Sequence, residues 1–211
     1  MKQELCKADY SDQRPTRKGL ELKTKPHVCI GVLLAWLFIS VCPAEAREPG
    51  YAKQKNIDGH TLTLRGTGVL RYMVFIKAYK GVFYLQEGKT ADQATDGKAA
   101  RCLVLYYFQP IKAGDFAEAT REMIKKNVSS DRFSSLLPKI EKFNELYRDI
   151  KPGDRYTAAY TPESGTRLWL NDKLLGGVEG PSFAAAFFAI WIGENPIDET
   201  FRDRMLGRRR S

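Results

Sequence analysis

The chain has 211 residues, of which 43% are hydrophobic and 28% are charged, as in an ordinary soluble globular protein. These values argue against a collagen-like chain, a wholly disordered chain and a polytopic membrane protein. The formal net charge of +9 at pH 7 invites a nucleic-acid partner, but the basic residues are dispersed and show no interleaved aromatic residues, so we predict no nucleic-acid binding.

The first segment, 1–46, has the features of a secretory signal peptide. Residues 28–42 form an uncharged apolar run that is shorter than the about 20 residues of a spanning helix and similar to a signal-peptide core. Lys23 and Lys25 precede this run, and the small-x-small sequence at 44–46 follows it as a cleavage site. We therefore predict cleavage after position 46 and a secreted, periplasmic protein.

Several alternatives remain for this segment. Residues 28–42 would be an uncleaved membrane anchor if no cleavage occurred, and this anchor would be the chain's contact with a membrane. A lipid anchor on Cys42 fits less well, because a bulky valine precedes that cysteine where a small residue is expected. Residues 1–22 are long and mixed in charge for the start of a signal peptide, so translation beginning near Leu20 or Leu22 is a further hypothesis.

Strand-like sequence follows a polar lead at 47–57. Asp58-Gly59 predicts a turn, and 66–68 (Gly-Thr-Gly) predicts a bulge or bend within a strand. The run at 101–109 is apolar at both parities, which predicts a central strand covered on both faces, with Cys102 as a small buried hydrophobe. Strands are expected at 60–65, 69–77, 79–86 and 101–109.

Helical spacing begins after Pro110. Apolar residues recur every three or four positions from Phe116 to Tyr147, with a helix start at 114–115 and a break or fresh first turn near Pro138. The next expected elements are strands at 155–161 and 166–170, a hairpin turn at 171–172, an apolar helix at 182–191 and a short helix capped by Asp198. This order predicts one α+β domain at 58–207, followed by a basic tail at 208–211.

Motifs of several enzyme classes are absent. The sequence has no phosphate-binding P-loop, no complete dinucleotide fingerprint, no zinc-ligand spacing and no G-x-S-x-G, so we predict no metal and no cofactor. Arg71 stands out within the apolar run 68–76. It either extends to the sheet edge or points into a pocket, where it would bind a carboxylate or a phenolate. Tyrosines cluster on the neighbouring strand candidates at Tyr79, Tyr84, Tyr106 and Tyr107.

Three groups of residues together resemble a known family. Gly66-Thr67-Gly68, Arg71 and 75–85 resemble the signature hairpin of chalcone isomerase-like proteins, 139–154 resembles the following helix and turn, and 176–196 resembles the closing helix of the family's bacterial, secreted branch. The resemblance implies an open-faced β-sandwich, in which helices cover a large antiparallel sheet and a ligand cleft lies between them. Plant enzymes of the family close a flavanone ring without a cofactor, and relatives without their catalytic groups bind fatty acids or have no known activity.

The resemblance also implies roles for single residues. Arg71 matches the arginine that steers the substrate phenolate, Tyr79 falls at the hairpin threonine, and Phe116 falls at the tyrosine that opens the next helix. Ala119 and Met123 replace polar cleft residues. Since phenylalanine cannot donate the hydrogen bond that tyrosine does, stabilisation of developing charge would be reduced, which argues against flavanone chemistry.

The leading hypothesis from sequence is a non-catalytic binding protein for an amphipathic carboxylate such as a fatty acid. Arg71 would pair with the head group, Tyr79 would hydrogen-bond it, and Phe116 and the helix at 183–191 would line the cleft, with Tyr106 as a further ligand-binding residue. The alternative is a cofactor-independent isomerase or intramolecular lyase that uses Arg71 and Tyr79 on an enone-like substrate. A third hypothesis is a structural or partner-binding role in the envelope, and no oligomeric state is predicted.

Overall fold

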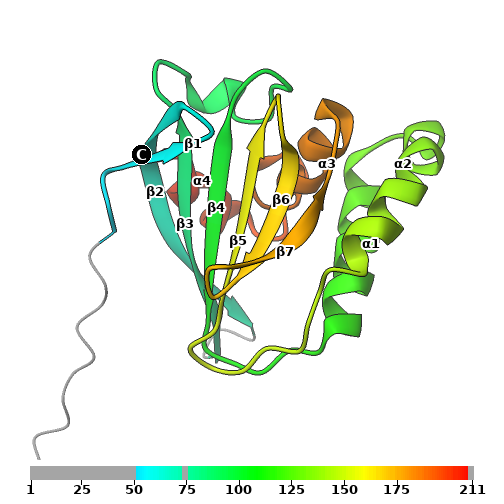
Figure 1. Cartoon of the computed structure of the whole chain (residues 1–211). Coiled ribbons are helices and arrows are strands. Elements are labelled where there is room, and N and C mark those ends of the chain that lie inside the picture. Colours follow the sequence, from blue (N-terminus) through cyan, green and yellow to red (C-terminus); the bar gives the residue numbers. More distant parts are fainter. Residues whose placement is uncertain (1–50, 73–75, 209–211) are drawn as a thin grey trace, which may run out of the picture. The chain divides into compact units, whose positions relative to one another are not determined.

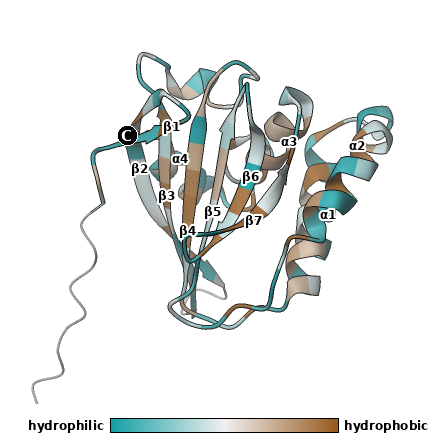
Figure 2. Cartoon of the chain, viewed as in Figure 1, coloured by the Kyte–Doolittle hydropathy of each residue, from teal (hydrophilic) through white to brown (hydrophobic). Residues whose placement is uncertain are grey.

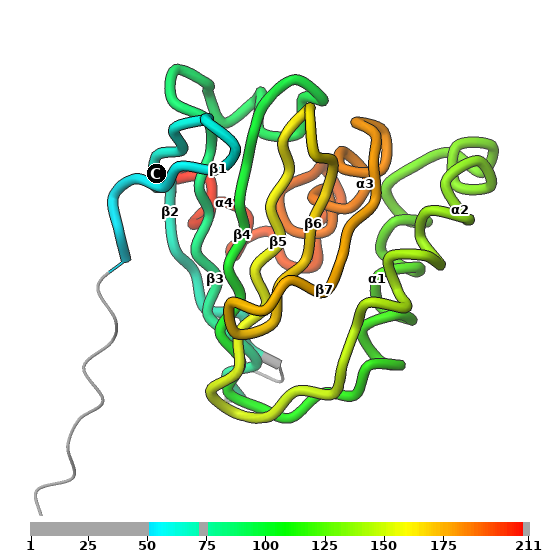
Figure 3. Tube along the Cα trace, viewed as in Figure 1, coloured from blue at the N-terminus to red at the C-terminus, as the bar shows by residue number. Residues whose placement is uncertain are grey.

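The computed structural model describes residues 51–72 and 76–208, which belong to one compact unit, 48–211. Within these residues, seven strands form one antiparallel sheet, in which neighbours along the chain are also neighbours in space (Figures 1 and 3). The strands are β1 (Gln54–Ile57), β2 (His60–Tyr72), β3 (Ile76–Gln86), β4 (Arg101–Tyr107), β5 (Arg155–Thr161), β6 (Gly165–Leu170) and β7 (Lys173–Val178). The predictions for 1–46 lie outside the described residues.

In the described part of the chain, four α-helices cover one face of this sheet. Two helices join β4 to β5 and two follow β7, so the order of elements is the predicted one (Figure 1). The helices are α1 (Ala113–Asn127), α2 (Ser130–Asn144), α3 (Pro181–Ile192) and α4 (Glu199–Met205), with a short 3-10 helix at Ala91–Gln93. The predicted α+β open-faced sandwich is therefore confirmed. Within the described ranges, no helix is long and apolar enough to cross a membrane.

The turns that the sequence predicts are present because they depend on local residues. Asp58 has a φ of 51° and connects β1 to β2. Asn171 and Asp172 have φ values of 49° and 71° and connect β6 to β7. Asparagine and aspartate adopt this left-handed conformation more readily than other residues with a side chain. The two strands that these turns add to the sheet, β1 and β7, were not themselves predicted.

One expected helix boundary is wrong. Pro138 lies inside α2 instead of breaking it. The real break comes earlier, at Val128, where the chain becomes extended. Ser129 then caps α2 by accepting a hydrogen bond from the Arg132 amide at 3.4 Å. Pro138 removes one hydrogen bond to Ser134, which is exposed on α2, so water can satisfy the carbonyl that the proline leaves unpaired.

The central strand β4 is buried on both faces, as predicted. Leu103, Leu105 and Tyr107 point into the main core between sheet and helices. Cys102 and Val104 point into a smaller core on the opposite face. Burial raises the pKa of the Cys102 thiol to about 12, so this cysteine remains a protonated, inert core residue. Apolar colouring accordingly predominates along β4, whereas α1 and α2 alternate between polar and apolar residues (Figure 2).

The glycines at 66–68 have a packing role in addition to the predicted bulge. The register shifts between Leu64 and Gly66, but β2 continues through the glycines. A Cβ atom on Gly66 would lie 1.9 Å from the backbone oxygen of Arg204 in α4. Gly68 on β2 and Gly81 on β3 pair with each other, and both lie directly under the ring of Phe201. The glycines therefore form a flat floor on which α4 packs.

Candidate functional site

A cavity of about 720 Å³ lies between the helix-covered face of the sheet and helices α1 and α3. Its volume is within the range of about 300–1,000 Å³ that is typical of small-molecule sites. The lining residues come from β3 to β6, from α1 and α3, and from the loops beside them, and almost all are apolar or aromatic. They are Ile76, Ala78, Tyr79, Leu103, Leu105, Tyr107, Gln109, Ile111, Asp115, Phe116, Ala119, Thr120, Met123, Tyr147, Tyr156, Ala158, Leu168, Phe187, Ile190, Trp191 and Ile197.

The cavity opens to solvent at one end of the sheet. Ile76 at the start of β3 and Ile197 in the loop between α3 and α4 are large apolar lining residues that remain 45% and 41% exposed. Gln109 after β4 and Asp115 in the first turn of α1 are also exposed. Because β3 begins where its antiparallel neighbour β4 ends, these residues mark the mouth of the cavity.

Hydroxyl groups supply most of the polarity inside the cavity. The indole N–H of Trp191 donates to the Tyr79 hydroxyl at 3.0 Å. Thr120 and Tyr147 share a hydrogen bond of 2.8 Å between their hydroxyls. Tyr107 lies beside Tyr79, with ring centroids 5.4 Å apart, and is 3% exposed. The interior can therefore offer hydrogen bonds to a ligand without offering charge.

These phenols remain protonated at neutral pH. Burial raises the pKa of Tyr79, and the negative charge of Asp198 raises it further, although the bond from Trp191 acts in the opposite direction. Burial likewise raises the pKa values of Tyr107 and Tyr147. The tyrosines are thus suited to donating hydrogen bonds and unsuited to acting as bases near pH 7.

No cationic residue lines the cavity among the described residues, and Asp115 at the mouth is its one formally charged member. The nearest buried cation along the floor strand is Arg101, two residues before Leu103 on β4. Its guanidinium lies between the rings of Tyr160 and Phe188, at 4.7 and 4.9 Å, and donates to two backbone carbonyls of the preceding loop. Burial lowers its pKa to about 10, so it stays charged but outside the cavity lining.

Two of the four predicted site residues lie in the cavity. Tyr79 is on its sheet floor and Phe116 is on its helix wall, where the Phe116 ring stacks on Tyr147 at 5.3 Å. Ala119 and Met123, which replace polar residues of the plant enzymes, also line the wall. These positions make the cavity more apolar, as the sequence implied.

Arg71 is not brought to this cavity. It pairs with Lys77 across β2 and β3, immediately after a register shift at Leu70, and both basic side chains are exposed. Leu70, which pairs with Tyr79, packs against the main core instead. Leu70 and Arg71 are successive residues of β2 and point to opposite faces of the sheet, so Arg71 lies outside the lining of this cavity.

Tyr106 lies on the opposite face of the sheet from Tyr79 and Phe116. Its ring is 5.7 Å from that of Tyr51 and packs against the smaller core. It lines a separate, open hollow together with Trp169. Successive residues of a strand point to opposite faces, so Tyr106 and its neighbour Tyr107 cannot share one cavity. Tyr106 therefore lies outside the apolar cavity, and Tyr107 lines it.

Sequence reasoning missed Tyr107 as a lining residue and the polar role of Trp191. Tyr107 was part of the noted tyrosine cluster and shares its parity with Leu103 and Leu105, but a strand that is apolar on both faces does not reveal which parity faces the helices. Trp191 belongs to the helix at 183–191 that was predicted to line the cleft, and it does line the cavity, but no hydrogen bond was predicted for it. Its hydrogen bond to Tyr79 connects residues 112 positions apart.

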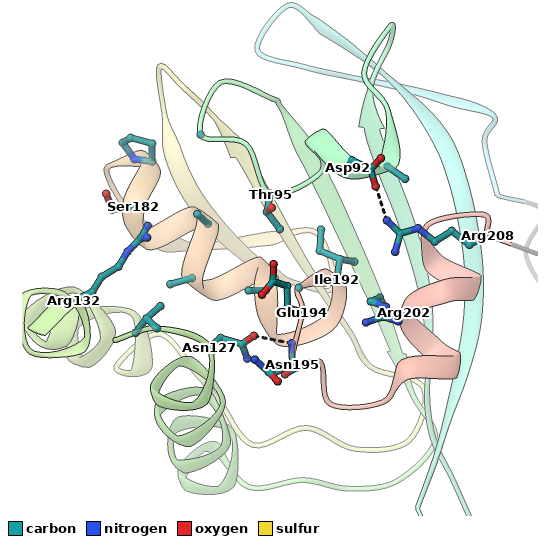
Figure 4. Close-up of a pocket in the computed structure, with 18 residues that line it drawn as sticks. Asp92, Thr95, Asn127, Arg132, Ser182, Ile192, Glu194, Asn195, Arg202 and Arg208 are labelled. Carbon is teal, nitrogen blue, oxygen red and sulfur yellow. Dashed lines mark hydrogen bonds and ion pairs between the residues drawn. The ribbon is translucent and has the colours of Figure 1, made fainter. Parts of the chain in front are cut away.

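A second hollow, of about 760 Å³, lies on the outer side of α3 and is strongly polar (Figure 4). Arg208 is hydrogen-bonded to Asp92 across it at 2.7 Å, and the Asn127 side chain bonds the backbone of Asn195. Arg202 donates to Asp203 at 3.0 Å. Most of its charged groups are thus already paired within the chain. Among the described residues, no cluster of His, Cys, Asp or Glu could hold a metal ion.

The sequence and the fold that enclose this apolar cavity can be compared with those of known proteins. A family model described as chalcone isomerase-like matches residues 45–207. The chain belongs to the chalcone isomerase-like family. Its predicted resemblance to this family is confirmed, whereas a sequence search of characterised proteins finds no match.

The fold of this chalcone isomerase-like chain is also found in a solved structure. The crystal structure of a fatty-acid binding protein from Arabidopsis thaliana matches with a TM-score of 0.60, over 74% of this chain and 91% of that chain. The two sequences are 13% identical, so the match shows a shared fold and no more.

Proposed function

We propose that this protein is a secreted, non-catalytic carrier that binds an amphipathic carboxylic acid, such as a fatty acid, in the cavity between sheet and helices. The observation that carries the proposal is the lining itself, which is apolar apart from uncharged hydroxyls and a polar mouth. Burying a methylene group in such a site contributes about 0.8 kcal/mol, so an acyl chain gains affinity with length. The fatty-acid binding of the plant protein with the same fold supports the same ligand class.

The raised pKa values of the buried tyrosines in the lining support a carrier over an enzyme. A general acid or base works best when its pKa lies near the operating pH. The buried tyrosines have raised pKa values, and Asp115 is exposed at the mouth. An isomerase remains the second candidate, because the Tyr79 and Tyr107 hydroxyls would also polarise the carbonyl of an enone.

Binding and turnover separate these two candidates. We expect dodecanoic acid to bind the mature chain with 1:1 stoichiometry, to change the fluorescence of Trp191 in the cavity wall, and to raise the melting temperature because it binds the folded state. A panel of chalcones should show no turnover above the solution rate. If any chalcone is turned over and no fatty acid binds, the isomerase becomes the proposed function in place of the carrier.

Substituting Arg71 tests the revised site. We expect Arg71→Ala to change the affinity for dodecanoic acid by less than about fivefold, because the exposed guanidinium lies outside the cavity lining and an exposed charge contributes about 0–1 kcal/mol. Isothermal titration of both proteins measures the difference. A loss of more than tenfold would restore Arg71 as the head-group partner.

Secretion is part of the proposal and rests on the sequence of 1–46. N-terminal sequencing of the exported protein tests it, since cleavage after Ala46 makes Arg47 the first residue. A full-length chain retained in the membrane would indicate the anchor at 28–42.

A further inference from the structure

Two hydroxyl groups on the cavity floor are available to a ligand. Tyr79 on β3 and Tyr107 on β4 are register partners, and their side chains are 7% and 3% exposed. An indole N–H can only donate, so the Tyr79 oxygen accepts the bond from Trp191 and its own proton must find another acceptor. In the part of the chain that the structure describes, we find no such acceptor, and no hydrogen bond to the Tyr107 hydroxyl.

The charges that face these hydroxyls are negative or absent. The titratable groups around them are the phenols of Tyr147 and Tyr156, with Asp115 on α1 and Asp198 at the start of α4. The charge of Asp198 reaches the Tyr79 hydroxyl, whose pKa it raises. A carboxylate placed here would lose its hydration, gain no counter-charge from the lining, and be repelled by the same negative charge of Asp198 that acts on Tyr79.

We propose that the cavity holds the head group of its ligand uncharged, between the hydroxyls of Tyr79 and Tyr107. This inference rests on the proposed function and specifies the chemistry of the same site. The carbonyl oxygen of the head group accepts from the Tyr79 hydroxyl, and a protonated carboxyl donates its O–H to the Tyr107 oxygen. A fatty acid therefore takes up one proton from solvent as it binds, whereas an amide, an ester or an aldehyde binds without proton uptake.

The direction of the pH effect follows from this proton uptake. A free carboxyl group titrates near pH 4 to 5, and exclusion of its charged form raises its pKa in the complex. Binding is then strongest below the pKa of the free acid and is lost as the pH rises through the pKa of the bound acid. Between these two values the affinity falls by up to about tenfold for each pH unit.

Decanoic acid and decanamide make a matched pair of probes, since they have nearly the same shape and the amide does not titrate in this range. We expect the affinity for decanoic acid, measured by isothermal titration, to fall at least about tenfold between pH 5.0 and 7.5. The affinity for decanamide should stay within about twofold, which corrects for any pH effect on the protein itself. Proton uptake should appear as a dependence of the binding heat on the buffer.

Two tyrosine variants locate the head group. Tyr107→Phe keeps the ring and should weaken both probes about 2- to 10-fold, the effect of one hydrogen bond. Tyr106→Phe is the matched control, because Tyr106 is the next residue on β4 and faces the other side of the sheet, and it should leave both affinities unchanged.

The outcomes separate this inference from the function on which it rests. If decanoic acid binds equally well at pH 5.0 and 7.5, the uncharged head group is overturned and the carrier function is left intact. The same conclusion follows if decanoic acid binds more than tenfold more tightly than decanamide at pH 7.5. If neither probe binds at any pH, the carrier and the inference both fail. Equal loss in the Tyr107→Phe and Tyr106→Phe variants overturns the position assigned to the head group.

Discussion

Ala119→Trp is expected to reduce the affinity for dodecanoic acid by about 100-fold. Ala119 lines the apolar cavity from α1 and is itself exposed, so the larger side chain can enter the cavity without displacing a core residue. An indole in this position excludes the ligand from roughly three or four methylene positions. At about 0.8 kcal/mol for each methylene group, this loss corresponds to about two orders of magnitude in affinity. Isothermal titration of the variant against the wild type measures the loss directly.

A matched substitution on α3 distinguishes binding in the apolar cavity from binding in the polar hollow. Ala185 lines the polar hollow on the outer side of α3 and not the apolar cavity. Ala185→Trp should therefore bind dodecanoic acid as well as the wild type does. The reverse pattern, with binding lost in Ala185→Trp and kept in Ala119→Trp, would move the ligand to the polar hollow. Circular dichroism of both variants confirms that each is folded.

The second large effect is expected on stability. Gly66→Ala should lower the free energy of unfolding by about 3 kcal/mol or more, because the new Cβ would lie 1.9 Å from a backbone oxygen of α4. The helix must move away from the sheet, and this partly exposes Phe201 and Met205, whose complete burial contributes about 1.5–3 kcal/mol each. For a domain of this size the melting temperature should fall by about 6–12 °C.

Gly114→Ala provides the control for Gly66→Ala. Gly114 is in the first turn of α1, and nothing lies within 4 Å of the Cβ that alanine would add. Alanine is the better helix former, so this variant should be as stable as the wild type or more stable by up to about 1 kcal/mol. Thermal or urea unfolding of the two variants measures the contrast. Similar stability of both would show that α4 does not depend on close contact with Gly66.

The sequence was most informative where structure depends on neighbouring residues. The turns at Asp58-Gly59 and at 171–172 require left-handed backbone, and their residues tolerate it. The short helix α4 begins where Asp198 caps it, through a hydrogen bond of 2.6 Å from the Phe201 amide. By contrast, Pro138 was misjudged because a proline at an exposed site in α2 costs the helix only one hydrogen bond that water can replace.

The site was harder to predict because it depends on strand register and parity. Arg71 was the most conspicuous residue in the sequence, but its neighbour Leu70 on β2 faces the main core, so Arg71 points to the other face and is exposed. Tyr106 and Tyr107 are adjacent in sequence and similar in chemistry, and only the pleat of β4 decides which one faces the cavity. The Tyr79–Trp191 bond joins β3 to α3 and depends on how α3 docks on the sheet.

The two glycines of 66–68 show how one motif can support both fold and site. Their missing side chains let α4 lie flat on β2, which brings Phe201 within 5.7 Å of the Tyr79 ring, measured between ring centroids. Tyr79 is thus held between α4, α3 and its register partner Tyr107. Movement of α4 would loosen the cavity floor, so Gly66→Ala should weaken ligand binding as well as stability.

A crystal structure of the mature chain with 12-bromododecanoic acid would show where the protein holds the acyl chain and the head group. The bromine atom gives an anomalous signal that locates the end of the acyl chain without reference to any assumed position. We expect continuous density for the acyl chain inside the cavity between the sheet and helices α1 and α3, with the carboxyl group beside Tyr79 and Tyr107. Density for the acid in the polar hollow outside α3, or on the opposite face of the sheet beside Tyr106, would contradict this expectation.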